Sequence, residues 1–367
     1  MILNDEQRML QESMIDFLND QAPVEAFRTL RDDPSLGAYD QQLWRGMVEL
    51  GLPGLTSPEA YGGSDFGWLG MGAVLEEMGR RLTAAPVLSS VVLAQELIRH
   101  CASPAQLEDW LPPLVMGEHV LTAAINEGPH YAPDRLETRW IDGHLSGEKT
   151  LVMDFDGADG LLVVARDAQG DGVVVRVAVD APEMTVHSRR LMDGRNYASV
   201  VFNQTPVHAH DVLAGDAVAA GLARALDITA VAMASEMLGG ARELIDRTVA
   251  HLSEREQFGV KIGSFQALQH RCAQLYCDLE VAASAVYAAL DALDRQQEEI
   301  TQLASAAKAL ANDCFQKTSS EAVQLHGGMG VTDEMDIGLF LKRSRVCNQL
   351  FGSSDFHRQR YASCLGI

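Results

Sequence analysis

The sequence predicts a multidomain α+β protein in which a β domain separates two helical domains. Apolar residues recur at helical spacing over residues 1–118, short β-branched runs fill residues 119–219, and helical spacing returns over residues 220–367. Because helices, strands and helices follow one another in blocks, a doubly wound α/β fold is not expected. No G-x-G-x-x-G follows a strand, so the sequence does not predict a Rossmann dinucleotide site.

The middle domain carries the clearest strand signal. Residues 161–165 and 173–179 are β-branched runs separated by DAQGDG, a pattern typical of a β-hairpin. Residues 144–149 and 200–202 add further turn and strand signals. We therefore expect a compact antiparallel β domain. The apolar stripes that follow residue 220 are rich in alanine, which favours close packing of long helices in a bundle.

Composition excludes several classes of function. The formal net charge of -22, with no basic patch, disfavours binding to nucleic acid. No segment approaches the roughly 20 uninterrupted apolar residues that a membrane span needs, and the N-terminal residues lack a secretory pattern. The six cysteines form no C-x-x-C pair and the eleven histidines show no metal-binding spacing. A cytoplasmic protein without a metal site is expected.

Residues 255–266, REQFGVKIGSFQ, form the first segment with chemical potential. Arg255 offers a fixed fork of donors that suits a phosphate. Gly259 and Gly263 allow a tight connection between two helices, and Ser264 is a candidate N-cap for the second helix. The alternative is a plain interhelical turn in which the arginine meets the helix dipole, and composition alone favours this alternative.

Residues 324–332, QLHGGMGVT, form the second segment. Glycines remove Cβ atoms, so a ligand could lie against this backbone and accept its N–H groups. The alternative is a helix C-cap, which would account for one glycine but not for three. The residues themselves leave both interpretations open.

Together these two segments resemble the acyl-CoA dehydrogenase family, in which R-x-x-F-G-x-x-I-x-x-F-Q is followed further along the chain by Q-x-x-G-G-x-G. The resemblance runs almost end to end. Its other matching positions are residues 51–53, 58–63, 76–80, Pro86, 145–149 and 158–159. Several independent motifs in the same order make a chance match improbable.

The resemblance implies a helical N-terminal domain (1–118), an antiparallel β-barrel-like middle domain (119–219) and a C-terminal four-helix bundle (220–367) with the FAD and oligomer interface. It also implies an FAD-dependent oxidoreductase that introduces an α,β double bond into an acyl-CoA thioester. An electron-transfer flavoprotein is the implied electron acceptor. Because relatives share one FAD between subunits, at least a dimer is implied, and a dimer of dimers is usual.

The resemblance also implies which residues bind FAD. Arg255 matches the arginine that contacts the pyrophosphate across a subunit interface, and Gln257 and Phe258 match positions around the adenine half and the flavin. Gln266 matches the interface glutamine. Gln324, Gly327 and Gly328 match the backbone cradle that receives the same FAD from the neighbouring subunit.

The catalytic base is where this sequence departs from the family. Removing the weakly acidic α-proton of a thioester requires a positioned carboxylate. Gly352 stands where relatives usually carry that glutamate, and Thr229 stands at the position that other relatives use. Asp355 and Asp227 lie nearby in sequence. Each is interpreted as a surrogate base or, as we favour, as a solvated or helix-capping aspartate.

The β domain departs as well. Glu127 matches the family's T-E-x-x-x-G-S-D segment, but its serine–aspartate end is missing. Residues 151–153, LVM, replace the tryptophan-isoleucine-threonine that covers the flavin in relatives. The pattern for contacts to the flavin ring is therefore incomplete in this part of the chain.

Three functions stay open at this point. The favoured one is the subunit without a base in a heteromeric (α2β2) enzyme, whose homologous partner carries the glutamate. The ending, phenylalanine-glycine followed by an aspartate and His357-Arg358, resembles bacterial small subunits of the pimeloyl-CoA and steroid side-chain type. One alternative is a self-sufficient homo-oligomeric dehydrogenase, or a flavin enzyme of altered chemistry, that uses Asp355 or another group. The other is a structural or interaction protein that has lost the flavin.

Overall fold

The computed structural model describes residues 3–297 and 300–367, which form two compact units. The first contains the described residues up to 28 together with 68–83 and 230–367, and the second contains residues 29–67 and 84–229. Along the chain, helices precede and follow a block of strands, so the predicted α+β class is confirmed. The three-part domain division stays a prediction.

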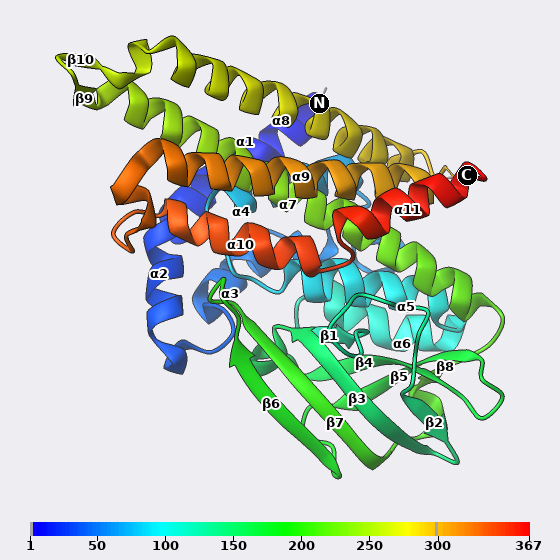
Figure 1. Ribbon diagram of the computed structural model, residues 1–367. Helices are drawn as coiled ribbons and strands as arrows, with labels where there is room; N and C mark the ends of the chain where they lie inside the picture. The colour runs from blue at the N-terminus through cyan, green and yellow to red at the C-terminus, as the bar shows by residue number, and fades with distance from the viewer. Residues whose placement is uncertain (1–2, 298–299) are drawn as a thin grey trace. The chain divides into compact units, whose positions relative to one another are not determined.

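The first unit is almost entirely helical (Figure 1). Helices α8 and α9 pack along each other, and α10 and α11 both pack on α9. Helices α2 (Val24–Asp32) and α7 (Ala217–Glu254) each cross from one unit to the other. The remaining elements are α1 (Asp5–Gln21), α4 (Trp68–Arg80), β9 (Glu256–Gln257), β10 (Val260–Lys261), η7 (Ile262–Ser264), α8 (Gln266–Asp294), α9 (Ile300–His326), η8 (Gly327–Val331), α10 (Ile337–Gln349) and α11 (Ser354–Cys364).

The predicted apolar stripes of the last three long helices form the core of this unit. Leu238 and Leu244 of α7, Leu279 of α8 and Ala307 of α9 are fully buried. Helix α7 is long and apolar enough, by length and composition, to cross a membrane. However, 67% of its most apolar 18-residue window is buried inside the protein, as in the central helix of a packed bundle.

Helices α4 and α7 cross at two glycines. A Cβ built on Gly79 would lie 1.9 Å from the carbonyl oxygen of Glu236, and one on Gly239 would lie 1.8 Å from that of Glu76. The Glu76 carboxylate accepts from Arg242 and Tyr287, each at 2.8 Å. The segment at residues 76–80 therefore matches the family because it builds this close helix contact.

The start of α8 corrects one prediction. Ser264 does not cap this helix, since Phe265 holds the N-cap position and makes no side-chain capping bond. Ser264 instead lies in the 3-10 turn η7, where its hydroxyl donates to the carbonyl of Lys261 at 2.7 Å. A serine cap does form at α11, where Ser353 accepts from the N–H of Phe356.

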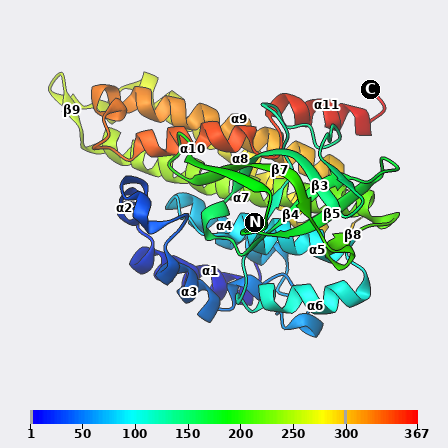
Figure 2. The same cartoon turned by 90° about the horizontal axis from the view of Figure 1, so that it is seen from below.

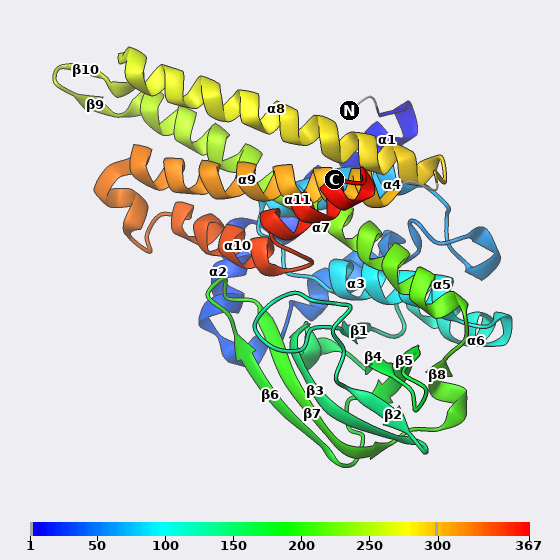
Figure 3. The ribbon, with the colours of Figure 1, turned by 45° about the vertical axis from the view of Figure 1, so that its right-hand side comes forward.

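The second unit is built on an eight-stranded sheet in the order β6-β7-β3-β2-β4-β5-β8, with β1 paired to β4. Figures 2 and 3 show this sheet from two further sides. The strands are β1 (Leu121–Ala124), β2 (Arg139–Ile141), β3 (His144–Met153), β4 (Gly160–Arg166), β5 (Gly172–Ala178), β6 (Met184–Arg190), β7 (Asn196–Pro206) and β8 (Val212–Leu213). The other elements are η1 (Pro34–Leu36), α3 (Gln41–Glu49), η2 (Leu52–Gly54), η3 (Glu59–Tyr61), η4 (Val87–Ala94), α5 (Gln95–Cys101), α6 (Pro104–Val115), η5 (Phe155–Gly157) and η6 (Ala209–Asp211).

Strand pairing confirms the predicted hairpin. Strands β4 and β5 are antiparallel, with Ala165 opposite Val173 at the turn. Most other pairs are also antiparallel, but β1 and β2 run parallel to β4. The alternate residues Leu161, Val163 and Ala165 point into one apolar core because successive strand residues face opposite sides of a sheet.

The helix crossing gives a direct stability test. Gly79→Ala or Gly239→Ala should lower the free energy of unfolding by about 1–3 kcal/mol or more, because the new methyl group meets a backbone carbonyl. The usual helix gain of roughly 0.5–1 kcal/mol for replacing glycine offsets only part of this. Chemical denaturation measures the change. Gly338→Ala in α10, where nothing lies within 4 Å of the new Cβ, is the matched control and should not destabilise.

Candidate functional site

The two segments singled out in the sequence meet at one end of the first unit. The His251 ring near the end of α7 stacks on the His326 ring at the end of α9, with centroids 4.3 Å apart and planes 24° apart. Arg255 lies one helical turn beyond His251, and its N–H donates to the His251 carbonyl. Gly327 follows His326 directly. The arginine segment and the glycine segment therefore lie side by side in one chain.

The arginine segment forms a hairpin that projects beyond α7 and α8 (Figures 1 and 3). Gln257 pairs with Val260 across a two-residue turn, in which Phe258 (φ 56°) and Gly259 (φ 78°) both have positive φ. Such turns match the twist of paired strands but normally use glycine or asparagine. Phe258 is 91% exposed, and its ring lies edge-on to that of Phe265, with centroids 6.2 Å apart.

All the residues predicted to bind FAD are exposed. They are Arg255, Gln257, Phe258, Gln266, Gln324, Gly327 and Gly328. No carboxylate in the described part of the chain forms an ion pair with Arg255, so its guanidinium is available to an anion. Four exposed apolar side chains lie on the same segments, namely Val260, Phe265, Met329 and Val331. Apolar groups gathered in this way mark a surface that something else covers.

The glycine segment contains one glycine that backbone geometry does not explain. Gly327 has φ 62° and ends α9, and a Cβ on Gly330 would lie 2.6 Å from the carbonyl oxygen of Val323. Gly328 has an ordinary φ, and nothing lies within 4 Å of a Cβ built on it. Its backbone is open to solvent, so an anionic group could approach this turn closely. That Arg255 and this turn hold a phosphate together stays a prediction.

The position of the family's glutamate is closed. Gly352 has φ 103°, and a Cβ built there would lie 2.6 Å from Phe356 Cδ1 and 2.8 Å from His357 Nε2. The preceding Phe351 also has a positive φ, 56°. A side chain at this position is strained by the positive φ and requires the Phe356 and His357 side chains, or the backbone, to shift.

The connector between α10 and α11, residues 350–353, is held by a buried lysine. Lys308 Nζ of α9 donates to Asn312 Oδ1 at 2.7 Å and to the carbonyls of Cys347 at 3.0 Å and Gly352 at 3.3 Å. Asn312 Nδ2 donates to the same Gly352 carbonyl at 3.2 Å. The three acceptors of Lys308 are all neutral, and burial lowers the pKa of Lys308 to about 7.

His357 completes this connector. Its Nε2–H donates to the carbonyl of Phe351 at 2.8 Å, and its Nδ1 has no hydrogen-bond partner in the described structure. Burial, reinforced by the charge of Lys308, lowers the pKa of His357 to about 3, so the imidazole is neutral at physiological pH. Where relatives carry a carboxylate, this chain carries a neutral ring, an ammonium and backbone carbonyls. None of these can serve as the carboxylate base of the reaction.

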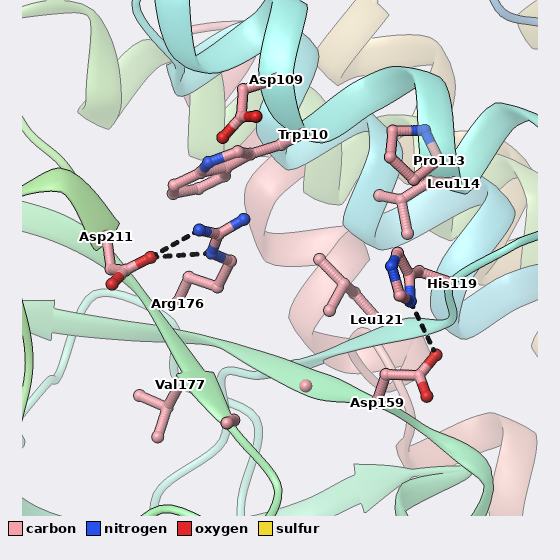
Figure 4. Close-up of a pocket in the computed structure, with 12 residues that line it drawn as sticks. Asp109, Trp110, Pro113, Leu114, His119, Leu121, Asp159, Arg176, Val177 and Asp211 are labelled. Carbon is pink, nitrogen blue, oxygen red and sulfur yellow. Dashed lines mark hydrogen bonds and ion pairs between the residues drawn. The ribbon is translucent and has the colours of Figure 1, made fainter.

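A cavity of about 510 Å³ in the second unit was not predicted (Figure 4). The Arg176 guanidinium lies 4.0 Å from the centroid of the Trp110 ring and pairs with Asp211 at 2.7 Å. On another wall, His119 lies 3.6 Å from Asp159. Asp109 lies 3.4 Å from His210. Each charged residue labelled in Figure 4 therefore has a partner within the second unit. No group of His, Cys, Asp or Glu among the described residues is arranged to hold a metal ion.

Comparison with known proteins identifies the family. The model for "Acyl-CoA dehydrogenase, N-terminal domain" matches residues 4–118, and that for "Acyl-CoA dehydrogenase, C-terminal domain" matches residues 220–365. The chain belongs to the acyl-CoA dehydrogenase family. Members of this family are FAD-dependent oxidoreductases that act on acyl-CoA.

Individual relatives match along nearly their whole length. Acyl-CoA dehydrogenase IpdE2 of Mycolicibacterium smegmatis is 30% identical over 95% of this chain and 96% of its own. A solved structure of a variant of the Tcur3481-Tcur3483 steroid ACAD is 28% identical, with a TM-score of 0.89 over 99% of this chain and 98% of that one. Butyryl-CoA dehydrogenase from Megasphaera elsdenii, at 23% identity and a TM-score of 0.90 over 100% of both chains, shares the fold.

The second position at which relatives were expected to carry the base also holds a residue with a structural hydrogen bond. Thr229 is fully buried, and its hydroxyl donates to the carbonyl of Ala225 at 2.7 Å, one turn back along α7. The Asp355 side chain is 95% exposed in the first turn of α11 and lies 3.3 Å from Arg358, so it is solvated as predicted. Asp227 is different, because it is 1% exposed in the interior of α7. The prediction that Asp227 is solvated or caps a helix was wrong.

The family glutamate of the β domain has a structural role. Glu127 Oε1 accepts from the buried Lys149 at 2.5 Å, and its carboxylate also accepts from the N–H groups of Glu137 and Thr138. Burial alone would raise the pKa of Glu127, but the hydrogen bond and charge of Lys149 lower it. Glu127 therefore fixes the loop between β1 and β2. Val152 and Met153, which were expected to replace flavin-covering residues of the family, are buried.

Restoring the family's glutamate should fail. We expect Gly352→Glu and Gly352→Ala both to destabilise, by about 1–2 kcal/mol from the positive φ and about 1–3 kcal/mol from the contacts with Phe356 and His357. Gly215→Ala, which has φ 119° and no atom within 4 Å of the new Cβ, isolates the contribution of φ. Urea denaturation measures all three. If Gly352→Ala and Gly215→Ala lower the free energy of unfolding equally, the contacts with Phe356 and His357 make no contribution.

The buried lysine should make stability depend on pH. Because the folded-state pKa of Lys308, about 7, lies below its ordinary value of 10.5, the unfolded chain binds more protons between these values. The free energy of unfolding should therefore rise with pH across this window, by up to about 1.4 kcal/mol per pH unit, and the burial cost should be full below it. Urea denaturation at several pH values should show this rise in the wild type relative to Lys308→Met. Parallel curves for the two proteins would contradict it.

Proposed function

We propose that this chain is an FAD-binding acyl-CoA dehydrogenase subunit without the catalytic base, acting in a heteromer with a homologous subunit that carries it. One observation supports this more than any other. The end of the first unit that carries the family's cofactor motifs is exposed and open, whereas the position of the base is closed by Phe356 and His357. A chain that had simply lost its cofactor would not need an exposed and open surface at these motifs.

The residues present fit the FAD of the family. Arg255 would hold the pyrophosphate, the open backbone at Gly327 and Gly328 would receive it, and Gln324 would border this cradle. Gln257, Phe258 and Gln266 would pack around the remaining parts of the cofactor. When bound, FAD supplies the hydride acceptor of the reaction. The protein itself must bind and orient the acyl-CoA, exclude water and remove the α-proton.

Proton removal is the step that this chain cannot perform alone. It needs a carboxylate within hydrogen-bond reach of the α-carbon, and Gly352 and Thr229 supply none. Asp355 points to solvent and pairs with Arg358, which does not favour a surrogate role. A glutamate-bearing homologue in an α2β2 assembly is therefore the proposed source of the base.

The exposed surface supports a partner subunit. The Phe258 ring is 91% exposed and Val331 is 76% exposed, and both lie on the segments that carry the cofactor motifs. Two solved relatives are named as pairs, the Tcur3481-Tcur3483 steroid ACAD and the ChsE4-ChsE5 complex from Mycobacterium tuberculosis. By likeness to the first, we propose a steroid-derived acyl-CoA as substrate. An electron-transfer flavoprotein is the proposed acceptor, and the cytoplasm the proposed location.

Flavin spectroscopy tests this proposal. The chain co-expressed with a glutamate-bearing homologue should co-purify with it, and the complex should show a flavin band that acyl-CoA bleaches anaerobically. The isolated chain should show no bleaching. Arg255→Ala should weaken FAD binding by about ten- to a hundredfold, since a charge-assisted hydrogen bond contributes about 1.5–3 kcal/mol. Arg45→Ala, which changes an exposed arginine of α3, is the matched control and should leave the flavin content unchanged.

Each other outcome points to a different function. Bleaching of the isolated chain that is lost in Asp355→Asn would establish a self-sufficient dehydrogenase. A colourless complex, with no effect of Arg255→Ala on flavin content or assembly, would establish a structural homologue without flavin. Absence of any complex with the homologue would exclude the heteromer.

A further inference from the structure

The stacked pair His251–His326 joins the glycine segment, which contains His326, to the helix that leads into the arginine segment, yet no part of the proposed reaction uses it. His326 is 5% exposed, and its Nδ1 lies 2.8 Å from the carbonyl of Ala322, so Nδ1 carries the proton. Its Nε2 and the His251 ring remain free to accept a proton. The rings are only 4.3 Å apart, so two imidazolium charges would repel and the pair can hold one extra proton at most.

The charges around the pair favour its neutral form. Burial lowers the pKa of His251 first, and the neighbouring His326 and Arg255 lower it further, with only Glu254 acting in the opposite direction. Burial and the charge of Arg247 likewise lower the pKa of His326. Arg247 itself pairs with Glu243 of α7 and with Asp336, which begins α10. Arg28 of α2 pairs with Asp336 and lies 3.6 Å from Asp333.

We propose that the His251–His326 pair takes up a proton when a nucleoside diphosphate group binds against Arg255 and the Gly327–Gly328 turn, so that cofactor binding is linked to pH. This inference rests on the proposed binding of FAD. The chemical class recognised is the ADP half of FAD, whose diphosphate is anionic throughout the pH range in which histidine titrates.

The linkage follows from position. Arg255 directly follows the end of α7, and its N–H donates to the carbonyl of His251 four residues before it; Gly327 is covalently next to His326. In the free protein, the charge of the Arg255 guanidinium disfavours the imidazolium. An anion placed between Arg255 and this turn neutralises that charge. It also adds an opposite charge near the rings. Both changes favour protonation. Because the complex binds more protons than the free protein, affinity must rise as pH falls.

Titration calorimetry tests the inference directly. FAD is titrated into the apoprotein, or into its complex with the partner subunit, between about pH 6 and 8 in two buffers of different ionisation enthalpy. We expect uptake of up to one proton per FAD and an affinity that rises on acidification by at most about tenfold per pH unit. ADP should reproduce the proton uptake. Riboflavin, which lacks phosphate, should not.

Variants assign the proton. His251→Gln and His326→Gln should each bind FAD with little proton uptake and a flat pH profile, whereas His187→Gln, an exposed histidine of β6, should behave as wild type. Should either variant fail to fold, histidine NMR titration of the wild type with and without ADP must show an upward pKa shift of the pair. FAD binding without proton uptake, or uptake that persists in both variants, would overturn the inference and leave the proposed function intact. No binding of FAD or ADP at any pH would overturn both.

Discussion

The buried ammonium of Lys308 fixes the path of the chain at the connector, where the sequence is expected to depart from the family. An ammonium without a carboxylate partner is costly to bury, so it needs every donor satisfied. Asn312 and the carbonyls of Cys347 and Gly352 satisfy them. Those two carbonyls belong to the end of α10 and to the connector, so the same bonds that solvate the lysine fix the turn. This turn also brings the His357 ring next to Gly352.

At the end of the first unit that carries the cofactor motifs, the side chains are exposed rather than buried and hydrogen-bonded. Its residues are exposed, Arg255 has no ion-pair partner among the described residues, and Phe258 adopts a positive φ that few aromatic residues adopt. These features carry a free-energy cost in an isolated protomer, since they bury little apolar area and strain a backbone turn. A ligand and a second subunit would remove that cost by covering the surface. The exposed Arg255 segment and the crowded connector therefore both support the proposal of chemistry shared with a second subunit.

Sequence patterns predicted the parts of this structure that depend on local spacing. The hairpin of β4 and β5, the long helices after residue 220 and the two motif segments are all legible from periodicity and turn residues. The errors at Ser264 and Asp227 have one cause, because both residues commonly cap helices but here the helix boundaries lie elsewhere. The role of Lys308 was missed because two of its three acceptors lie 39 and 44 residues away in sequence, and no spacing rule reports a contact of that range.

The geometry at Gly352 also separates two ways in which a subunit can lack a base. If only the glutamate side chain had been removed, the backbone would leave a gap that the side chain could refill. Here Phe351 and Gly352 both have positive φ, and Phe356 and His357 occupy the space that a Cβ would enter. Returning a carboxylate would require the Phe356 and His357 side chains, or the backbone at Gly352, to shift. This local crowding supports the proposal that a base, where the reaction needs one, comes from another chain.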